Sequence, residues 1–142
     1  MFLVLSSCSH QDVVDNRQAQ IDSLKHQIEL LKPGLGEFMI QFEYHHDRLG
    51  NAIRKQDFAR AAYEIDELKE TAERIQALQI TNDKLQKPFP IFFEKYLKSP
   101  FDVLASAAEK KDNVTLQNNF IALTNNCNSC HHENNVEPFA NP

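Results

Sequence analysis

Two cysteines and a histidine lie together near the end of the sequence, as Cys127-Asn128-Ser129-Cys130-His131. Two thiols at this spacing, followed directly by an imidazole, form the C-x-x-C-H signature of covalent haem attachment. The thiols can reach the two vinyl groups on one porphyrin edge, and the imidazole is placed to bind the iron. The motif predicts one haem c, with Cys127 and Cys130 as thioether residues and His131 as the proximal axial ligand.

The three side chains share one face if the segment is helical. Cys130 then lies about 60° behind Cys127, and His131 lies about 40° ahead of it, so all three occupy an arc of about 100°. The arc continues the apolar positions Phe120 and Leu123. We therefore expect the motif to face the protein core, where a porphyrin can be buried.

Two other types of site use the same residues. A thioredoxin-like redox pair belongs beside a βαβ pattern, which this sequence does not show. A zinc site would take Cys127, Cys130, His131 and His132, but one short segment rarely supplies all four ligands of a closed tetrahedron. Haem attachment is the favoured interpretation.

Four segments with apolar residues at steps of three and four predict the helices that position the motif. They cover about residues 35–55, 58–78, 91–110 and 113–132. Asp57 and Asp112 are predicted N-caps, and Ser99-Pro100 marks a candidate break in the third segment. Residues 79–90 are predicted to form a loop. The pattern predicts an all-α, antiparallel four-helix bundle over residues 35–133, followed by a polar tail over residues 134–142.

The composition agrees with a single helical domain. Of 142 residues, 42% are hydrophobic and 25% are charged, and only three are Gly and six are Pro. These numbers suit a packed core and are unlike those of a turn-rich β fold. The net charge of −5, without a basic run, argues against nucleic acid as a partner. Neither an acid–base pair nor a nucleophile triad is visible, so the sequence does not predict an enzyme.

An additional helix with a heptad-like pattern is predicted before the bundle, within residues 9–34. Its apolar positions are Val14, Ile21, Leu24, Ile28 and Leu31. A spacer above a membrane, a self-association helix and a fifth helix on the body all fit this pattern.

The first eight residues resemble the end of an export signal. Leu5-Ser6-Ser7-Cys8 is similar to a bacterial lipobox, in which the cysteine is lipidated and becomes the new N-terminus. This resemblance implies a lipoprotein on the periplasmic side of a bacterial envelope, attached to the membrane by a lipid on Cys8 alone. The alternative is an apolar N-terminus with an incidental cysteine.

The predicted bundle with C-x-x-C-H in its last helix resembles the class II c-type cytochromes, the cytochrome c-prime group. The resemblance covers about residues 35–139. It is closer to exported bacterial monohaem proteins that carry a His-x-Lys-Leu-Trp-like stretch in the first bundle helix. That stretch reads His45-His46-Asp47-Arg48-Leu49-Gly50 here, with Gly50 at the tryptophan position.

The first bundle helix supplies the distal side of the haem in that group, so the resemblance implies that the sixth iron ligand comes from residues 35–55. His46 is the first choice for this ligand, and Met39 and His45 are the alternatives. A further possibility is that Phe42 faces the iron, which leaves the iron five-coordinate and open to a small gas.

These features predict a monohaem c-type cytochrome that carries single electrons in the cell envelope. Its acidic surface favours basic redox partner proteins, and its heptads allow a homodimer. The alternatives are a five-coordinate haem module that binds or senses nitric oxide or carbon monoxide, and a haem-free interaction protein of the envelope.

Overall fold

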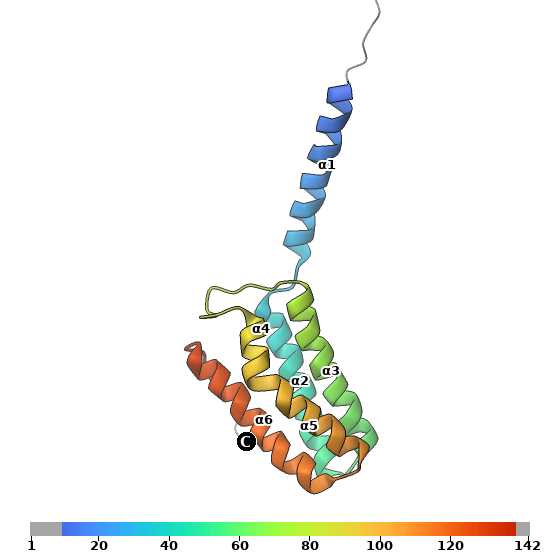
Figure 1. The fold of residues 1–142 in the computed structure, drawn as a ribbon, viewed down its shortest axis with the longest axis vertical. Coiled ribbons are helices and arrows are strands. Elements are labelled where there is room, and N and C mark those ends of the chain that lie inside the picture. The colour runs from blue at the N-terminus through green and yellow to red at the C-terminus, as the bar shows by residue number, and fades with distance from the viewer. Residues whose placement is uncertain (1–9, 139–142) are drawn as a thin grey trace, which may run out of the picture. The chain divides into compact units, whose positions relative to one another are not determined.

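The computed structural model describes residues 10–138, with side chains from Asn16 onward. Within this range every regular element is helical, which confirms the all-α class (Figure 1). The elements are α1 (His10–Leu31), α2 (Leu35–Arg54), α3 (Phe58–Ala77), α4 (Phe89–Phe92), η1 (Phe93–Leu97), α5 (Lys98–Glu109) and α6 (Asn113–Glu133). The chain divides into one unit that ends at Lys32 and a second that begins at Pro33.

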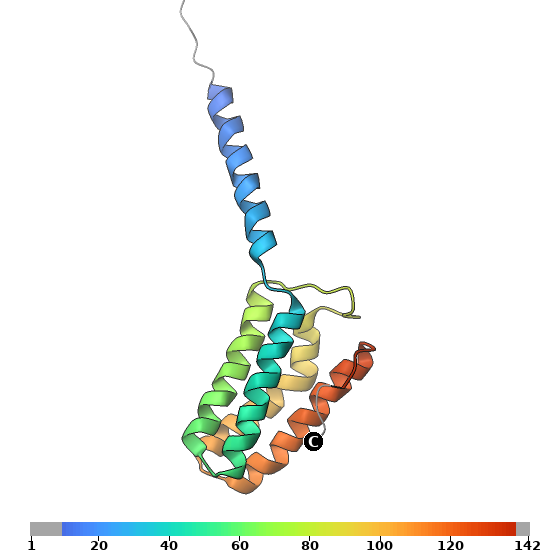
Figure 2. The same ribbon diagram turned by 180° about the vertical axis from the view of Figure 1, so that it is seen from behind.

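The helices of the second unit pack against one another around one apolar core. α2 lies along α3, α3 along α5, and α5 along α6 (Figures 1 and 2). Each helix contributes a stripe of apolar residues spaced by three or four positions, as a helix with one buried face requires. The largest fully buried apolar side chains are Phe38, Leu49, Ile65, Leu68, Ile75, Phe92, Phe101, Leu104, Leu116 and Leu123.

The two predicted aspartate caps are confirmed. The Asp57 carboxylate accepts the backbone N–H of Arg60 at 3.0 Å, and the Asp112 carboxylate accepts that of Thr115 at 3.1 Å. Each bond satisfies one of the N–H groups that a helix N-terminus leaves without a partner inside the helix. These caps fix where α3 and α6 begin, and so fix the position of the motif along α6.

The third predicted helix differs from expectation in two ways. It begins at Phe89, so residues 89 and 90 are helical, and it runs through Ser99-Pro100 without a break. The irregularity lies earlier, in the π-helical turn η1. Pro100 has no N–H to donate to the carbonyl of Tyr96, four residues before it. That carbonyl instead accepts the Asn126 side-chain amide of α6 at 2.9 Å, which anchors α6 directly before Cys127.

Helix α1 carries its apolar positions in solvent. Ile21, Leu24, Ile28 and Leu31 are all exposed within the described unit. The lipobox residues and Cys8 lie outside the described residues. Among the helices of residues 10–138, none combines the length and the hydropathy needed to cross a bilayer.

Gly50 permits a close approach between α2 and α6. A Cβ at position 50 would lie 2.8 Å from Cζ of Phe120, whereas a Cβ at Gly36 would meet nothing within 4 Å. The Phe120 ring also stacks on His46, one turn before Gly50, with ring centroids 4.5 Å apart. Phe120 therefore fills the space beside Gly50, which leaves no room there for a larger side chain at position 50.

Replacing Gly50 with alanine tests this contact. In Gly50→Ala, the overpacking cost of about 1–3 kcal/mol opposes the gain in helix propensity of about 1 kcal/mol. Gly36→Ala brings the propensity gain without the clash. We expect Gly50→Ala to be less stable than Gly36→Ala in urea unfolding. Equal stabilisation by both substitutions would contradict the close approach.

Candidate functional site

The three motif residues lie on one face of α6 and open onto a common apolar cavity. Cys127, Cys130 and His131 line a cavity of about 50 Å³. The rest of the lining comes from α2, α4 and η1, and consists of Met39, Phe42, Phe89, Phe92 and Leu97. The three motif residues therefore face inward, as their positions on one helical arc predicted.

A larger cavity of about 290 Å³ adjoins the first and shares four lining residues with it: Met39, Phe89, Cys130 and His131. Its outer wall comes from the loop between α3 and α4 and from the segment after α6. Figure 2 shows the C-terminal half of α6 diverging from α2 on this side. The motif thus borders a mostly apolar space between α6 and α2. Lys84 is the one Asp, Glu, Lys or Arg residue in the lining of the larger cavity.

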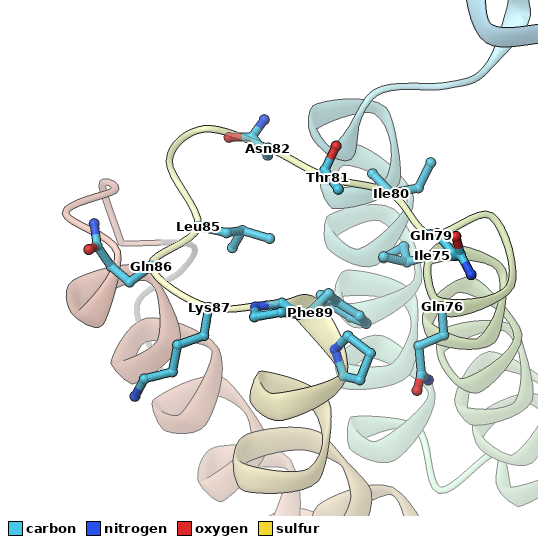
Figure 3. Close-up of a pocket in the computed structure, with 12 residues that line it drawn as sticks. Ile75, Gln76, Gln79, Ile80, Thr81, Asn82, Leu85, Gln86, Lys87 and Phe89 are labelled. Carbon is cyan, nitrogen blue, oxygen red and sulfur yellow. The ribbon is translucent and has the colours of Figure 1, made fainter.

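The loop between α3 and α4 separates this space from a third cavity, of about 420 Å³ (Figure 3). Asn82, Leu85 and Phe89 line both cavities. Figure 3 shows Leu85 directed into the space under the loop and Lys87 directed away from it. Leu85 therefore borders hollow space on both sides of the loop.

The imidazole of His131 is oriented by the backbone that follows α6. Its Nδ1 lies 2.6 Å from the carbonyl oxygen of Glu137. A carbonyl only accepts, so Nδ1 carries the proton and the Nε2 of the neutral ring carries the lone pair. Metal-binding histidines are commonly held in this way, with the second ring nitrogen donating to a backbone carbonyl or a carboxylate.

Burial keeps both thiols protonated at neutral pH. It raises the pKa of Cys127 to about 12, with a contribution from the neighbouring Cys130. Burial and the negative charge of Glu133 raise the pKa of Cys130 to about 11. Neither cysteine is in a disulfide. These thiols are therefore poor nucleophiles in the closed fold.

Glu133 holds the C-terminal end of α6, two residues after His131. Its carboxylate accepts from Nζ of Lys95 at 2.6 Å, from the Tyr96 hydroxyl at 2.6 Å and from Nζ of Lys87 at 3.0 Å. These bonds, led by that from Lys95, lower the pKa of Glu133 to about 2. The clamp joins α6 to η1 and to the end of the loop before α4.

Asn134 adds a second attachment and was not singled out by the sequence, which assigns it to the polar tail. It is buried, its amide nitrogen donates to the Cys130 carbonyl at 2.8 Å, and its amide oxygen accepts the Gln86 backbone N–H at 2.8 Å. A polar residue after a helix is ordinarily exposed, so no local signal in the sequence identifies this role.

The three candidates for the sixth ligand lie in different surroundings. Met39 lines both cavities beside Cys130 and His131. His46 lines a narrow cavity of about 10 Å³, together with Phe42 and Cys127. His45 lines none of these three cavities. Of the three candidates, Met39 is the one that shares these two larger cavities with Cys130 and His131.

His46 is a buried residue with a hydrogen bond to α6. Its Nε2 lies 2.7 Å from Oγ1 of Thr124, and that hydroxyl donates to the Phe120 carbonyl at 3.0 Å. The hydroxyl proton is thereby used, so Nε2 of His46 is the donor to Thr124. Burial lowers the pKa of His46, which keeps the ring neutral at pH 7.

His45 lies about 100° around α2 from His46 and meets a buried carboxylate on α3. Its Nδ1 lies 2.7 Å from Glu64, whose carboxylate also accepts from Arg48 at 2.8 Å and pairs with Arg60. Burial alone would raise the pKa of Glu64, but the bonds from His45 and Arg48 outweigh it and lower the pKa overall. This cluster joins α2 to α3.

The described residues contain no group of three or more His, Cys, Asp and Glu side chains arranged to hold a metal ion by themselves. The four-ligand zinc set considered from the sequence is therefore not assembled in residues 10–138. Haem needs only one protein ligand on its proximal side together with the thioether links. The donors present fit that requirement.

Comparisons with protein-family models, curated proteins and solved structures found no match for this chain.

Removing the three hydrogen bonds that Glu133 makes with Lys87, Lys95 and Tyr96 should change how the free energy of unfolding depends on pH. The pKa of Glu133 is about 2 in the folded chain and near 4.5 without its partners. The depressed value stabilises the fold above pH 4.5, and this contribution is lost as the pH falls toward 2. Glu133→Gln should lower the free energy of unfolding at pH 7 and flatten its dependence on pH between about 4.5 and 2.

Glu94→Gln is the matched control for this measurement. Glu94 pairs with Lys98 four residues later, at 2.7 Å, and both side chains are exposed. Such pairs contribute little to stability. Urea unfolding at several pH values compares the two variants with the parent. Identical pH profiles for Glu133→Gln and the parent would show that the clamp does not hold α6.

Proposed function

We propose that this protein is a monohaem c-type cytochrome that carries single electrons. The observation that carries the proposal is the convergence of both motif thiols and the His131 imidazole on one apolar cavity between α6 and α2. A solvent-facing motif would offer a porphyrin no such environment. The contact between Nδ1 of His131 and the Glu137 carbonyl supports the proposal, because metal-binding histidines are commonly oriented through the second ring nitrogen in this way.

We further propose that the second unit is an antiparallel four-helix bundle of the cytochrome c-prime type. The four members are α2, α3, the continuous segment α4–η1–α5, and α6. Short connections join α2 to α3 and α5 to α6, and in such bundles short connections place consecutive helices antiparallel. In this arrangement the first and last helices enclose the haem site.

The residues divide the work of binding the haem. Cys127 and Cys130 would hold the haem by thioether bonds, each made by adding the S–H group across one vinyl group, which needs no oxidant. His131 would bind the iron, with its ring oriented by the Glu137 carbonyl. Phe42 and Phe89, which line the same cavity, would limit access of water to the site. The bound haem supplies the one-electron chemistry of iron.

We place Met39 at the sixth position, ahead of the sequence-based first choice, His46. Met39 lines the cavity next to His131, whereas His46 donates its Nε2 proton to Thr124. In this proposal His46 joins α2 to α6 through Thr124. A thioether ligand raises the reduction potential relative to a second imidazole.

The site of action is inferred from the sequence resemblance. Leu5-Ser6-Ser7-Cys8 supports a lipoprotein attached through Cys8 on the periplasmic side of a bacterial envelope. The net charge of −5 favours a redox partner with a basic docking surface.

Expression with a haem-attachment system tests the proposal directly. The intact chain should gain about 616 Da, the mass of one haem that supplies both vinyl groups. The double variant Cys127→Ala/Cys130→Ala should gain nothing, while Ser129→Ala, inside the same motif, should gain the full mass. Intact-protein mass spectrometry reads the result. A parent chain without the added mass would refute the cytochrome proposal.

The visible spectrum of the reduced protein tests the sixth ligand. The parent should be low-spin and unchanged by carbon monoxide. Met39→Leu should be high-spin and bind carbon monoxide, because it opens the sixth position, and its reduction potential should fall. His46→Leu should stay low-spin. The reverse pattern would assign the ligand to His46, and a parent that already binds carbon monoxide would favour the gas-binding alternative.

A further inference from the structure

Helix α1 carries a continuous apolar stripe that its own unit leaves in solvent. Its members are 45% (Ile21), 57% (Leu24), 65% (Ile28) and 84% (Leu31) exposed. Their spacing of three, four and three residues is that of the a and d positions of a heptad repeat. We propose that α1 pairs with α1 of a second copy of this chain as a parallel, two-stranded coiled coil.

The residue types at the two heptad positions point to this number of strands. Ile21 and Ile28 occupy a, and Leu24 and Leu31 occupy d. β-branched residues at a with leucine at d favour parallel dimers over trimers and tetramers. The preceding a position, Val14, is also β-branched. Arg17 at the preceding d position is exposed and limits the close-packed part of the stripe to residues 21–31.

The flanking positions distinguish the two possible orientations. Gln20 and Gln27 occupy g, and Lys25 and Lys32 occupy e. In a parallel pair each g residue faces an e residue of the partner, which places glutamine beside lysine. In an antiparallel pair e faces e, which places lysine beside lysine at a cost in stability. The charge pattern therefore favours the parallel arrangement.

The same lysines are partly neutralised within their own helix. Lys25 lies 4.0 Å from Asp22, and Lys32 lies 3.6 Å from Glu29. Asp22 and Glu29 occupy b, away from the stripe. The outer face is thus acidic, with four Asp or Glu in α1 against one Arg and one Lys. Helices that lie on membrane surfaces are instead rich in Lys and Arg on the polar face. A second chain suits the stripe better than a lipid surface.

The stripe is short, so the pair is weak and depends on concentration. Helices in proteins gain most of their stability by packing an apolar face, and here that face is short. Two chains held by their N-termini in one membrane would start their α1 helices side by side, as the parallel arrangement requires. The proposal does not depend on haem, because α1 belongs to the unit that ends at Lys32.

Cysteine cross-linking of the full chain tests both the pairing and its direction. In a parallel pair a d residue faces its own copy, so Leu24→Cys should cross-link to itself under mild oxidation. Ser23→Cys, at the outer c position next to it, is the matched control. Both are made with Cys8→Ser, and gels are read against the Cys8→Ser parent. We expect the Leu24→Cys dimer to form at least tenfold faster than the Ser23→Cys dimer.

Two outcomes would overturn the proposal. Equal rates for Leu24→Cys and Ser23→Cys would mean that the stripe does not pair. Cross-linking only between a mixture of Leu24→Cys and Ile28→Cys chains would indicate an antiparallel pair.

Sedimentation equilibrium provides a second measurement. Ile28→Lys should raise the dimer dissociation constant more than tenfold, and His26→Lys, on the outer f position, should leave it unchanged. If the cross-linking or the sedimentation result differs from this expectation, the pairing of α1 is refuted and the haem proposal is unaffected.

Discussion

The candidate haem site depends on the way α6 is held, because α6 carries all three motif residues. α6 packs mainly along α5 and η1, and its C-terminal half diverges from α2 (Figure 2). Polar bonds from Asn126, Glu133 and Asn134 fix this half to η1 and to the loop before α4. Attachment at the side and at the end leaves the inner face unfilled. That is how a helix can border an apolar space without collapsing onto its neighbour.

The two adjacent histidines of α2 contact two different helices, α3 and α6. His45 meets the buried Glu64 of α3, while His46 meets Thr124 of α6. Successive helical positions differ by about 100°, so the pair joins two different neighbours. Met39, about two turns before His46, lines the same cavity as the motif residues. Sequence alone could not separate these three roles, because all three residues lie on the wide inward face of one helix.

Local chemistry made some features predictable from the sequence: the helices, the Asp57 and Asp112 caps, and the inward direction of the motif. The features that the sequence missed depend on distant partners. The π-helical turn forms beside Pro100, but its carbonyl bond needs Asn126 from α6. Asn134 is buried only because it meets the loop before α4. The buried hydrogen bond of His46 likewise depends on Thr124, which lies 78 residues away in the sequence.

The most direct measurement is a crystal structure of the chain purified from cells that attach haem. We expect a porphyrin between α6 and α2, bonded to Cys127 and Cys130, with iron on Nε2 of His131 and on the Met39 sulfur. We also expect a displaced loop around Leu85. A porphyrin outside this space, or a chain whose two thiols carry no porphyrin, would contradict the proposed haem site.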